Sequence, residues 1–264
     1  MVFPLYFWLL FAAALLISAI GFKKYVWFIS LGYGFSIAGE GLVMLLLYGR
    51  SLTVGTAVAC VIFILYGCRL GGYLAYRELK SASYNKNMTG EIKQDVPLGV
   101  KFAIWITCAL LYVLEILPVF YRLHNGSGAN VWLYIGVVVM LCGIVLESAA
   151  DIQKNRAKKV NPKRFVDTGL YRLVRCPNYL GEMLFWTGVI LSGVGSVRGW
   201  QWLLAAVGYI GIIFVMFSGA RRLEIRQNKN YGRDPEYQKY VKSVPILVPF
   251  IPLYSVEKYK WLVA

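Results

Sequence analysis

The sequence has 264 residues, of which 58% are hydrophobic, and its formal net charge at pH 7 is +15. A water-soluble domain of this length is much less apolar, so the composition excludes an ordinary soluble enzyme. The chain contains one histidine and five cysteines, and the cysteines lie in or beside apolar segments. This pattern favours neither a histidine-based metal site nor a disulfide framework.

Apolar segments long enough to cross a bilayer recur along the whole chain. A membrane-spanning helix needs about 20 predominantly apolar residues. We therefore expect an all-α, polytopic membrane protein with seven transmembrane helices in a single domain over 1–264. The expected spans, in chain order, are roughly 3–20, 25–48, 53–76, 99–121, 129–150, 178–195 and 200–219.

The distribution of positive charge predicts how these spans are oriented. Seven spans place 24 of the 28 Lys and Arg residues on the side of the C-terminus and three on the opposite side, and Arg69 lies within the third span. Loops rich in Lys and Arg remain in the cytosol. We therefore expect the N-terminus outside, the C-terminus in the cytosol, and the long polar segments 77–98, 151–177 and 220–264 on the cytosolic side.

Two polar residues within the spans predict a site for a carbonyl group. Glu40 lies between two glycines, and Tyr66 lies in the next span. At 1.5 Å per residue they are about 22 and 15 Å from the inner ends of their spans, so adjacent antiparallel helices could bring them together. A neutral carboxyl beside a phenol would donate two hydrogen bonds to a ketone or enolate oxygen. A structural polar contact is the alternative for each residue, and for Arg69 as well.

The segment 151–182 combines eight cations with three acids. One interpretation is a juxtamembrane basic loop that contacts anionic lipid headgroups. It does not explain Asp151, or Asn178 and Glu182, which are four residues apart and would share one helix face. The other interpretation is a pocket for an anionic nucleotide, whose phosphates the cations would neutralise. The absence of Gly-rich phosphate motifs excludes a Rossmann or P-loop site.

The stretch "GLYRLVRCPNYLGEMLFWTG" (169–188), together with the later "YQKYVKSVPILVPFIP", resembles the steroid 5α-reductase family. The resemblance is strongest over 147–254. It is weaker upstream, where "LYGCRLGGYL" is similar to the family's Tyr/Arg segment. The chain departs from the pattern at Cys176, where many relatives have His, and after the last span, where "RRLEIRQNKNY" contains no histidine.

The resemblance implies seven membrane helices, a pocket for NADPH on the cytosolic side, and reduction of the C4–C5 double bond of 3-oxo-Δ4 steroids. It implies a substrate side mainly in 1–125 and a cofactor half in 126–264. Glu40 and Tyr66 would act on the substrate carbonyl. The residues implied to bind the cofactor are Arg69, Asp151, Arg156, Lys158, Arg164, Asn178, Tyr179, Glu182, Arg222 and Arg226.

The expected substrate is a flat, apolar enone that enters from the lipid. We expect contacts with membrane lipids, but neither a nucleic acid nor an obligate protein partner. The location would be a bacterial inner membrane, or the endoplasmic reticulum in a eukaryote. Two alternatives remain open: an S-adenosylmethionine-dependent methyltransferase of the isoprenylcysteine type, which has a similar Arg-x-Pro-x-Tyr segment, and a non-enzymatic sterol- or lipid-binding membrane protein.

Overall fold

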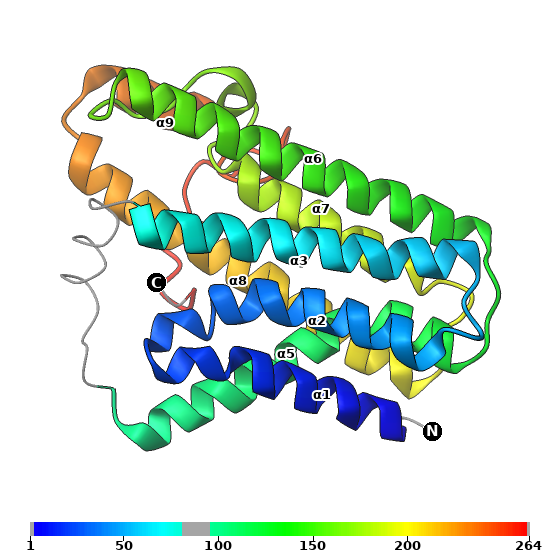
Figure 1. Cartoon of the computed structure of the whole chain (residues 1–264). Helices are drawn as coiled ribbons and strands as arrows, with labels where there is room; N and C mark the ends of the chain where they lie inside the picture. Colours follow the sequence, from blue (N-terminus) through cyan, green and yellow to red (C-terminus); the bar gives the residue numbers. More distant parts are fainter. Residues whose placement is uncertain (1–2, 81–95, 263–264) are drawn as a thin grey trace. The chain divides into compact units, whose positions relative to one another are not determined.

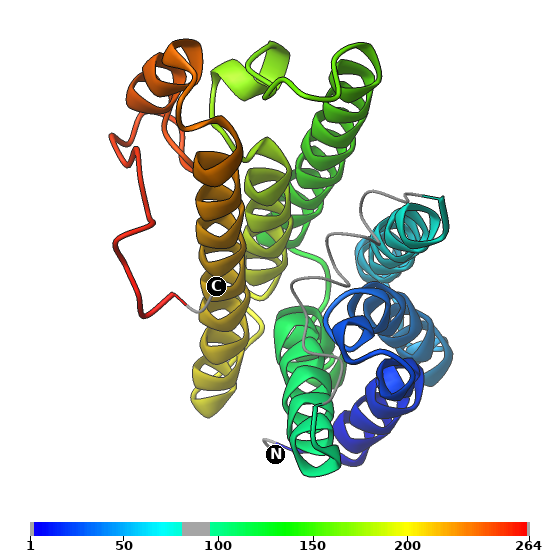
Figure 2. The ribbon, with the colours of Figure 1, turned by 90° about the vertical axis from the view of Figure 1, so that its left-hand side faces the viewer.

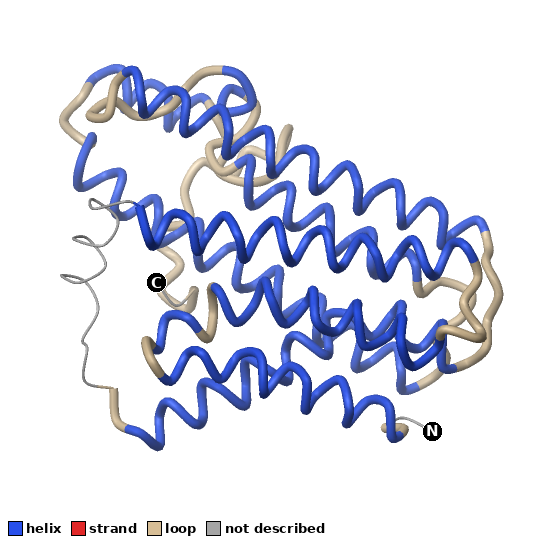
Figure 3. The backbone as a smooth tube through the Cα atoms, viewed as in Figure 1, coloured by secondary structure: helices blue, strands red, loops and turns tan. Residues whose placement is uncertain are grey.

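The computed structural model describes residues 3–80 and 96–262, and these residues form helices joined by turns, with no strand among them (Figure 3). Lys86 and Lys93, which contribute to the charge asymmetry, lie outside the described residues. The α-helices are α1 (Leu5–Ser18), α2 (Leu31–Tyr48), α3 (Val54–Lys80), α5 (Leu98–His124), α6 (Val131–Val160), α7 (Pro177–Ser192), α8 (Trp200–Tyr231) and α9 (Pro235–Ser243). Short 3₁₀ turns cover Ala19–Phe22, Tyr25–Trp27 and Gly169–Arg172.

Six helical segments of the described chain are long and apolar enough to cross a membrane. They are Leu5–Phe22, Tyr25–Tyr48, Val54–Glu78, Leu98–His124, Val131–Val160 and Trp200–Tyr231. The all-α class is thereby confirmed for the described residues. A helix also forms at the seventh expected position, but α7 has 16 residues, about 24 Å, which is shorter than the roughly 30 Å of a hydrocarbon core. The seventh span and the orientation of the termini stay predictions.

Two helices continue well beyond the apolar segments that predicted them. The expected spans end near 150 and 219, whereas α6 runs to Val160 and α8 to Tyr231. The basic stretch 151–160 is therefore helical, and whether the segment 151–182 contacts anionic lipid headgroups stays open. The physical reason is that lipid limits the apolar length of a helix but not its polar continuation. In α6 that continuation stops only before Asn161-Pro162, since proline cannot extend a helix.

The chain divides into two compact units. Unit 1 comprises Met1–Val137 and Val189–Gly208, and unit 2 comprises Val138–Gly188 and Tyr209–Ala264. The single domain expected from the sequence, with a substrate side and a cofactor half, stays a prediction.

In unit 1, α2 packs along α3, and the two helices run side by side (Figure 1). Glycines line this contact. A Cβ added to Gly67 would lie 2.3 Å from the carbonyl oxygen of Gly34, and one added to Gly41 would lie 2.8 Å from that of Cys60. Backbone therefore touches backbone, which is how small residues let membrane helices associate when lipid offers no hydrophobic driving force.

Replacing Gly67 with valine should prevent α2 and α3 from packing, because the atom that the new Cβ meets belongs to the backbone and cannot turn aside. We expect poor recovery of monodisperse protein, or a clearly lower thermal midpoint in detergent. Gly72→Val is the matched control, since a Cβ there meets nothing within 4 Å. Equal midpoints for the two variants would show that the glycine contact is not required.

The two ends of unit 1 are held by charged side chains. At one end, Lys24 pairs with Glu78 near the end of α3. At the other, the buried guanidinium of Arg122 donates to the carbonyl oxygens of Ser192 at 2.7 Å and Val194 at 2.8 Å, and it also contacts Asn130 at 3.1 Å. Arg122 therefore ties together the two connections that the charge pattern predicts on the same, outer side.

In unit 2, α7 contacts both α6 and the later part of α8, as the side view shows (Figure 2). A Cβ on Gly143 of α6 would lie 2.6 Å from the carbonyl oxygen of Gly181 of α7. On α8, Gly219 leaves room for the ring of Tyr179, whose atoms would lie 3.2 Å from a Cβ at that position. The close approach of α6 and α7 places Gly181, the neighbour of Glu182, directly beside Glu147 of α6.

Candidate functional site

Glu40 is a fully buried carboxyl on α2, with 0% of its surface exposed. Neither carboxyl oxygen has a hydrogen-bond partner among the described residues. Leaving a buried polar group unsatisfied costs about 1–3 kcal/mol, and most such groups in folded proteins are paired. The structure thus keeps a costly hydrogen-bonding group in the interior of unit 1 that the described chain itself does not use.

Tyr66 is equally buried on α3, and its hydroxyl lies 3.2 Å from that of Tyr33 on α2. The ring of Tyr33 in turn packs against that of Tyr112, with centroids 5.3 Å apart. No hydrogen bond joins Glu40 to Tyr66 in this structure. Their joint action on one carbonyl stays a prediction.

Tyr33 is a polar neighbour of Tyr66 that the sequence analysis missed. A signal for it was present, because Tyr33 precedes Glu40 by seven residues and therefore shares a face with it on a helix. The hydroxyl contact with Tyr66 gives this tyrosine a means of orienting the Tyr66 proton.

Arg69 is the one predicted cofactor residue that belongs to unit 1. Its guanidinium lies 5.8 Å from the ring centroid of Tyr73, one turn later on α3. A cation over an aromatic face is stabilised locally. This contact supports the structural alternative for Arg69, and its role toward a cofactor stays a prediction.

Three acidic side chains are buried on α6 and α7 of unit 2: Glu147, Asp151 and Glu182, with 3%, 6% and 6% of their surfaces exposed. Asp151 pairs with Lys154 at 3.1 Å. Asn178 is half-buried in the first turn of α7, one turn before Glu182. Glu147 was not predicted as a site residue, although it lies one turn before Asp151 and on the same face.

Two of the cations predicted to meet phosphates are engaged within the protein. Lys158 donates to the carbonyl oxygen of Arg164 at 2.5 Å and to the hydroxyl of Tyr231 at 2.9 Å. Arg164 pairs with Glu236 and, at 2.8 Å, with Asp167. Its hydrogen bonds to Glu236 and then Asp167 raise the pKa of the Arg164 guanidinium. Both cations hold the connection after α6 in place, and their role toward phosphates stays a prediction.

Other predicted cations lie on open helical surface. Arg156 on α6 is exposed, as are Arg222 and Arg226, which are four residues apart on α8 and share a face. Arg221, directly before Arg222 on α8, donates instead to the carbonyl oxygens of Glu257 and Leu262, each at 3.0 Å. One of these arginines, Arg221, therefore attaches the segment after α9 (244–262, here called the tail), whereas Arg222 and Arg226 face outward.

A buried ion pair joins three segments of unit 2. Arg175 and Glu224 have only 2% and 3% of their surfaces exposed, and they meet at 2.8 Å. The second oxygen of Glu224 accepts from the backbone N–H of Val256 at 2.8 Å, and Arg175 also donates to the carbonyl of Tyr254. The connection before α7, α8 and the tail are thereby linked at one point. Sequence alone could not indicate the pair, because its members are far apart in the chain.

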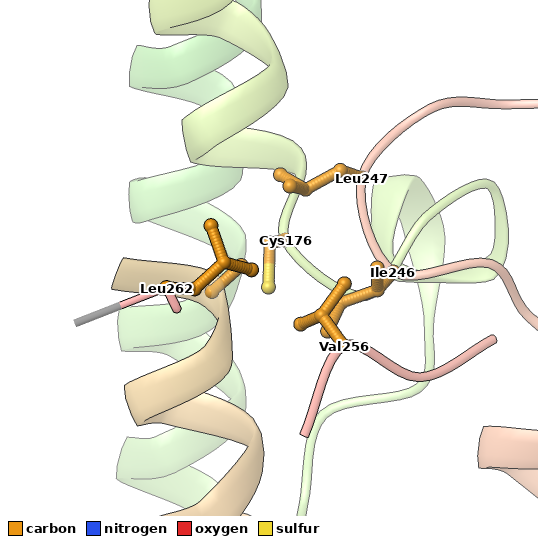
Figure 4. Packing of buried hydrophobic residues seen from close by; sticks show 6 residues of the cluster. Cys176, Ile246, Leu247, Val256 and Leu262 are labelled. Atoms are coloured by element: carbon orange, nitrogen blue, oxygen red, sulfur yellow. The ribbon is translucent and has the colours of Figure 1, made fainter. Parts of the chain in front are cut away.

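Cys176, directly before the start of α7, is a packing residue. It lies in a buried cluster with Ala220, Ile246, Leu247, Val256 and Leu262, most of them from the tail (Figure 4). Burial, the largest cause, raises the pKa of its thiol to about 12. The tail therefore covers the start of α7 with apolar contacts at this position.

The Cys176 thiol should resist alkylation in the folded protein. Because its pKa is raised in the folded state, the unfolded chain ionises first as the pH rises, and stability is lost between the ordinary thiol pKa and about 12. We expect labelling by iodoacetamide at pH 8 only after denaturation, measured by peptide mass spectrometry. Rapid labelling of the native protein would show that the tail does not cover this residue.

Comparison with known proteins identifies relatives of the chain. The model of the family described as "Protein of unknown function (DUF1295)" matches residues 16–244. The steroid 5-alpha-reductase DET2 of Arabidopsis thaliana is 35% identical over 120 residues, which cover 44% of this chain and 41% of that protein. No solved structure matches. The chain thus belongs to the DUF1295 family, and part of it is similar to a steroid 5-alpha-reductase.

Proposed function

We propose that the chain is an NADPH-dependent membrane reductase that reduces the C4–C5 double bond of 3-oxo-Δ4 steroids. The similarity to a plant steroid 5-alpha-reductase supports the reaction class. The apolar helices support an integral membrane protein that receives an apolar substrate from the lipid.

The observation that carries the proposal is Glu40. A purely structural carboxyl would have partners in the chain, whereas both oxygens of this one have none among the described residues. A 3-oxo steroid supplies an acceptor of the required kind, a carbonyl oxygen on an otherwise apolar molecule. A protonated Glu40 can donate to that oxygen without placing a net charge inside the unit.

Tyr66 is the second donor in this mechanism. As negative charge develops on the 3-oxo group, the Tyr66 hydroxyl and the Glu40 carboxyl stabilise it with hydrogen bonds, and the site excludes water that would weaken them. Tyr33 accepts from or donates to the Tyr66 hydroxyl, and so holds it in one orientation. The resulting enolate is then protonated at the α-carbon.

The residues of unit 2 fit NADPH by their chemistry. The exposed guanidinium groups of Arg156, Arg222 and Arg226 are suited to phosphate oxygens. Asp151 can accept from ribose hydroxyls, and Asn178 with Glu182 can bind a carboxamide. When bound, NADPH supplies the hydride that reaches the β-carbon of the enone. The protein's part is to bind, orient and exclude water.

Purified protein in lipid nanodiscs tests the proposal directly. With 4-deuterated NADPH and a 3-oxo-Δ4 steroid, we expect consumption of the nucleotide and a saturated product that carries deuterium at C5, detected by mass spectrometry. S-adenosylmethionine with a prenylated cysteine substrate tests the methyltransferase alternative in the same preparation. Methyl transfer without reduction, or binding of steroid without turnover, would contradict the reductase.

The exposed arginines of α8 should determine preference for NADPH over NADH. Replacing Arg222 and Arg226 with alanine should raise the KM for NADPH with a smaller effect on kcat. A hydrogen bond to a charged group is worth about 1.5–3 kcal/mol, or about 10- to 150-fold in binding. Arg233→Ala, which removes an exposed cation just beyond α8, is the control. An unchanged nucleotide preference in the double variant would assign the phosphates elsewhere.

A further inference from the structure

We propose that the C-terminal segment 246–262 is an interfacial membrane anchor. It would insert Phe250, Ile251 and Trp261 at the boundary between lipid headgroups and acyl chains, on the side where α8 leaves the bilayer. This inference concerns a surface that the proposed reaction does not use, and it stands on unit 2 alone.

The segment exposes large apolar side chains that the protein does not cover. Phe250 is 95% exposed, Ile251 is 52% exposed and Trp261 is 66% exposed. Phe250 also has a φ of 65°, a left-handed conformation that is rare for a bulky residue. The chain thus adopts a strained backbone at the most exposed large hydrophobic residue of the described chain, and such strain gathers at functional positions.

Trp261 contacts α8 near the point where the apolar part of that helix ends, which is the level that the proposal assigns to the membrane boundary. The apolar part of α8 ends at Ala220, and Arg221 begins its charged part. Arg221 donates to the carbonyl oxygen of Leu262. The Trp261 ring stacks on Phe214, with centroids 6.1 Å apart. Phe214 is seven residues, about 10 Å, from Arg221 toward the apolar part of the helix. Tryptophan is enriched at this depth in membrane proteins.

The Phe250 turn is fixed near the same boundary by the backbone on either side of it. The N–H groups of Arg175 and Cys176 donate to the carbonyl oxygens of Pro245 and Ile246, each at 2.9 Å. The N–H of Ile246 donates to the carbonyl of Leu253 at 2.9 Å, which closes the turn. The turn therefore projects from the start of α7, directly before its apolar residues begin.

Charge complementarity identifies the bilayer as the occupant of this surface. A hollow of about 290 Å³ beside Phe250 and Ile251 is also lined by Arg172, and Lys258 and Lys260 are exposed later in the segment. Exposed aromatic tips flanked by cations match the headgroup region of an anionic leaflet, where the rings enter the acyl boundary and the cations meet phosphates.

Photo-crosslinking in the full chain tests the anchor. The photoreactive amino acid p-benzoylphenylalanine replaces Phe250 or Trp261, one position at a time, in protein reconstituted into nanodiscs of phosphatidylcholine and phosphatidylglycerol. The substitution keeps an aromatic side chain at an exposed position, so the fold is expected to persist and is checked by size-exclusion chromatography. Leu203, 52% exposed in the apolar part of α8, is the lipid-facing control, and Glu236, with 67% of its side chain exposed on α9, is the water-facing control.

We expect phospholipid adducts at 250 and 261, detected by peptide mass spectrometry, in yields close to that at 203 and well above that at 236. Yields at 250 or 261 that equal the yield at 236 would overturn the proposal. A peptide adduct in place of a lipid adduct would overturn it as well, since the surface would then contact protein. The readout needs neither substrate nor cofactor, so it is independent of the proposed reductase activity.

Discussion

Glu40→Leu and Tyr66→Phe should each slow steroid reduction by about 10²–10³-fold, as expected for the loss of one donor to a developing oxyanion. Because both groups would act on a single oxygen atom, the double variant should be little slower than the slower single variant. The affinity for NADPH should be unchanged in all three. The measurement is steroid turnover and nucleotide binding for the two singles and the double in nanodiscs.

Two controls separate catalysis from folding. Tyr134→Phe removes a hydroxyl from a tyrosine that is 51% exposed, and it should leave turnover unchanged. Tyr33→Phe removes the partner of the Tyr66 hydroxyl and should give an intermediate loss, because the Tyr66 proton is then less well oriented. Losses that multiply in the Glu40/Tyr66 double variant, or full activity of Glu40→Leu, would assign Glu40 to packing.

Arg175→Met should lower the free energy of unfolding by about 3–5 kcal/mol, the usual cost of removing one member of a buried ion pair. The loss arises because Glu224 would stay buried without its cation. Among the described residues, its carboxylate would then accept only from the N–H of Val256. The measurement is unfolding in mixed micelles, followed by circular dichroism.

The pair offers a matched test of this explanation. Arg175→Met combined with Glu224→Leu removes both charges and should be more stable than Arg175→Met alone, since an apolar pair can replace a buried ion pair at little cost. Arg172→Met, an exposed cation of the same connection, should change stability by less than about 0.5 kcal/mol. A double variant that is less stable than Arg175→Met would show that the unpaired charge of Glu224 is not the cause of the loss.

The sequence predicted the helices of this fold better than their ends. The apolar run that predicted a span at 25–48 corresponds to a 3₁₀ turn followed by α2, because the run reports burial in lipid and not local hydrogen bonding. The helix α9 escaped prediction altogether, although Asp234 is an N-cap that accepts from the N–H of Glu236 and Pro235 follows it. Those are readable helix-start signals. They lie in a polar segment without apolar periodicity, and the expected helices were identified from apolar segments alone.

The candidate site was predictable in its components and not in its contacts. Glu40 is recognisable because a carboxyl between glycines in an apolar span is costly, and its complete burial agrees with that reasoning. The hydroxyl that Tyr66 contacts depends on how α2 and α3 are rotated about their axes. The sequence predicts the depth of a residue along its helix, but it does not predict this rotation. The roles of Lys158 and Arg164 were hidden for a similar reason, since their partners come from segments that only the folded chain brings near.

The glycine contact between α2 and α3 also has an entropic consequence. Tyr66 directly precedes Gly67, so its backbone is positioned by atoms that have no side-chain torsions, and no rotamer freedom is lost in forming the contact. Glycine normally weakens a helix, but in lipid each backbone group must be hydrogen-bonded within the chain, and this requirement offsets the weakness. The Cα of Tyr66 is therefore located by main-chain geometry, and thermal rearrangement of neighbouring side chains should displace it little.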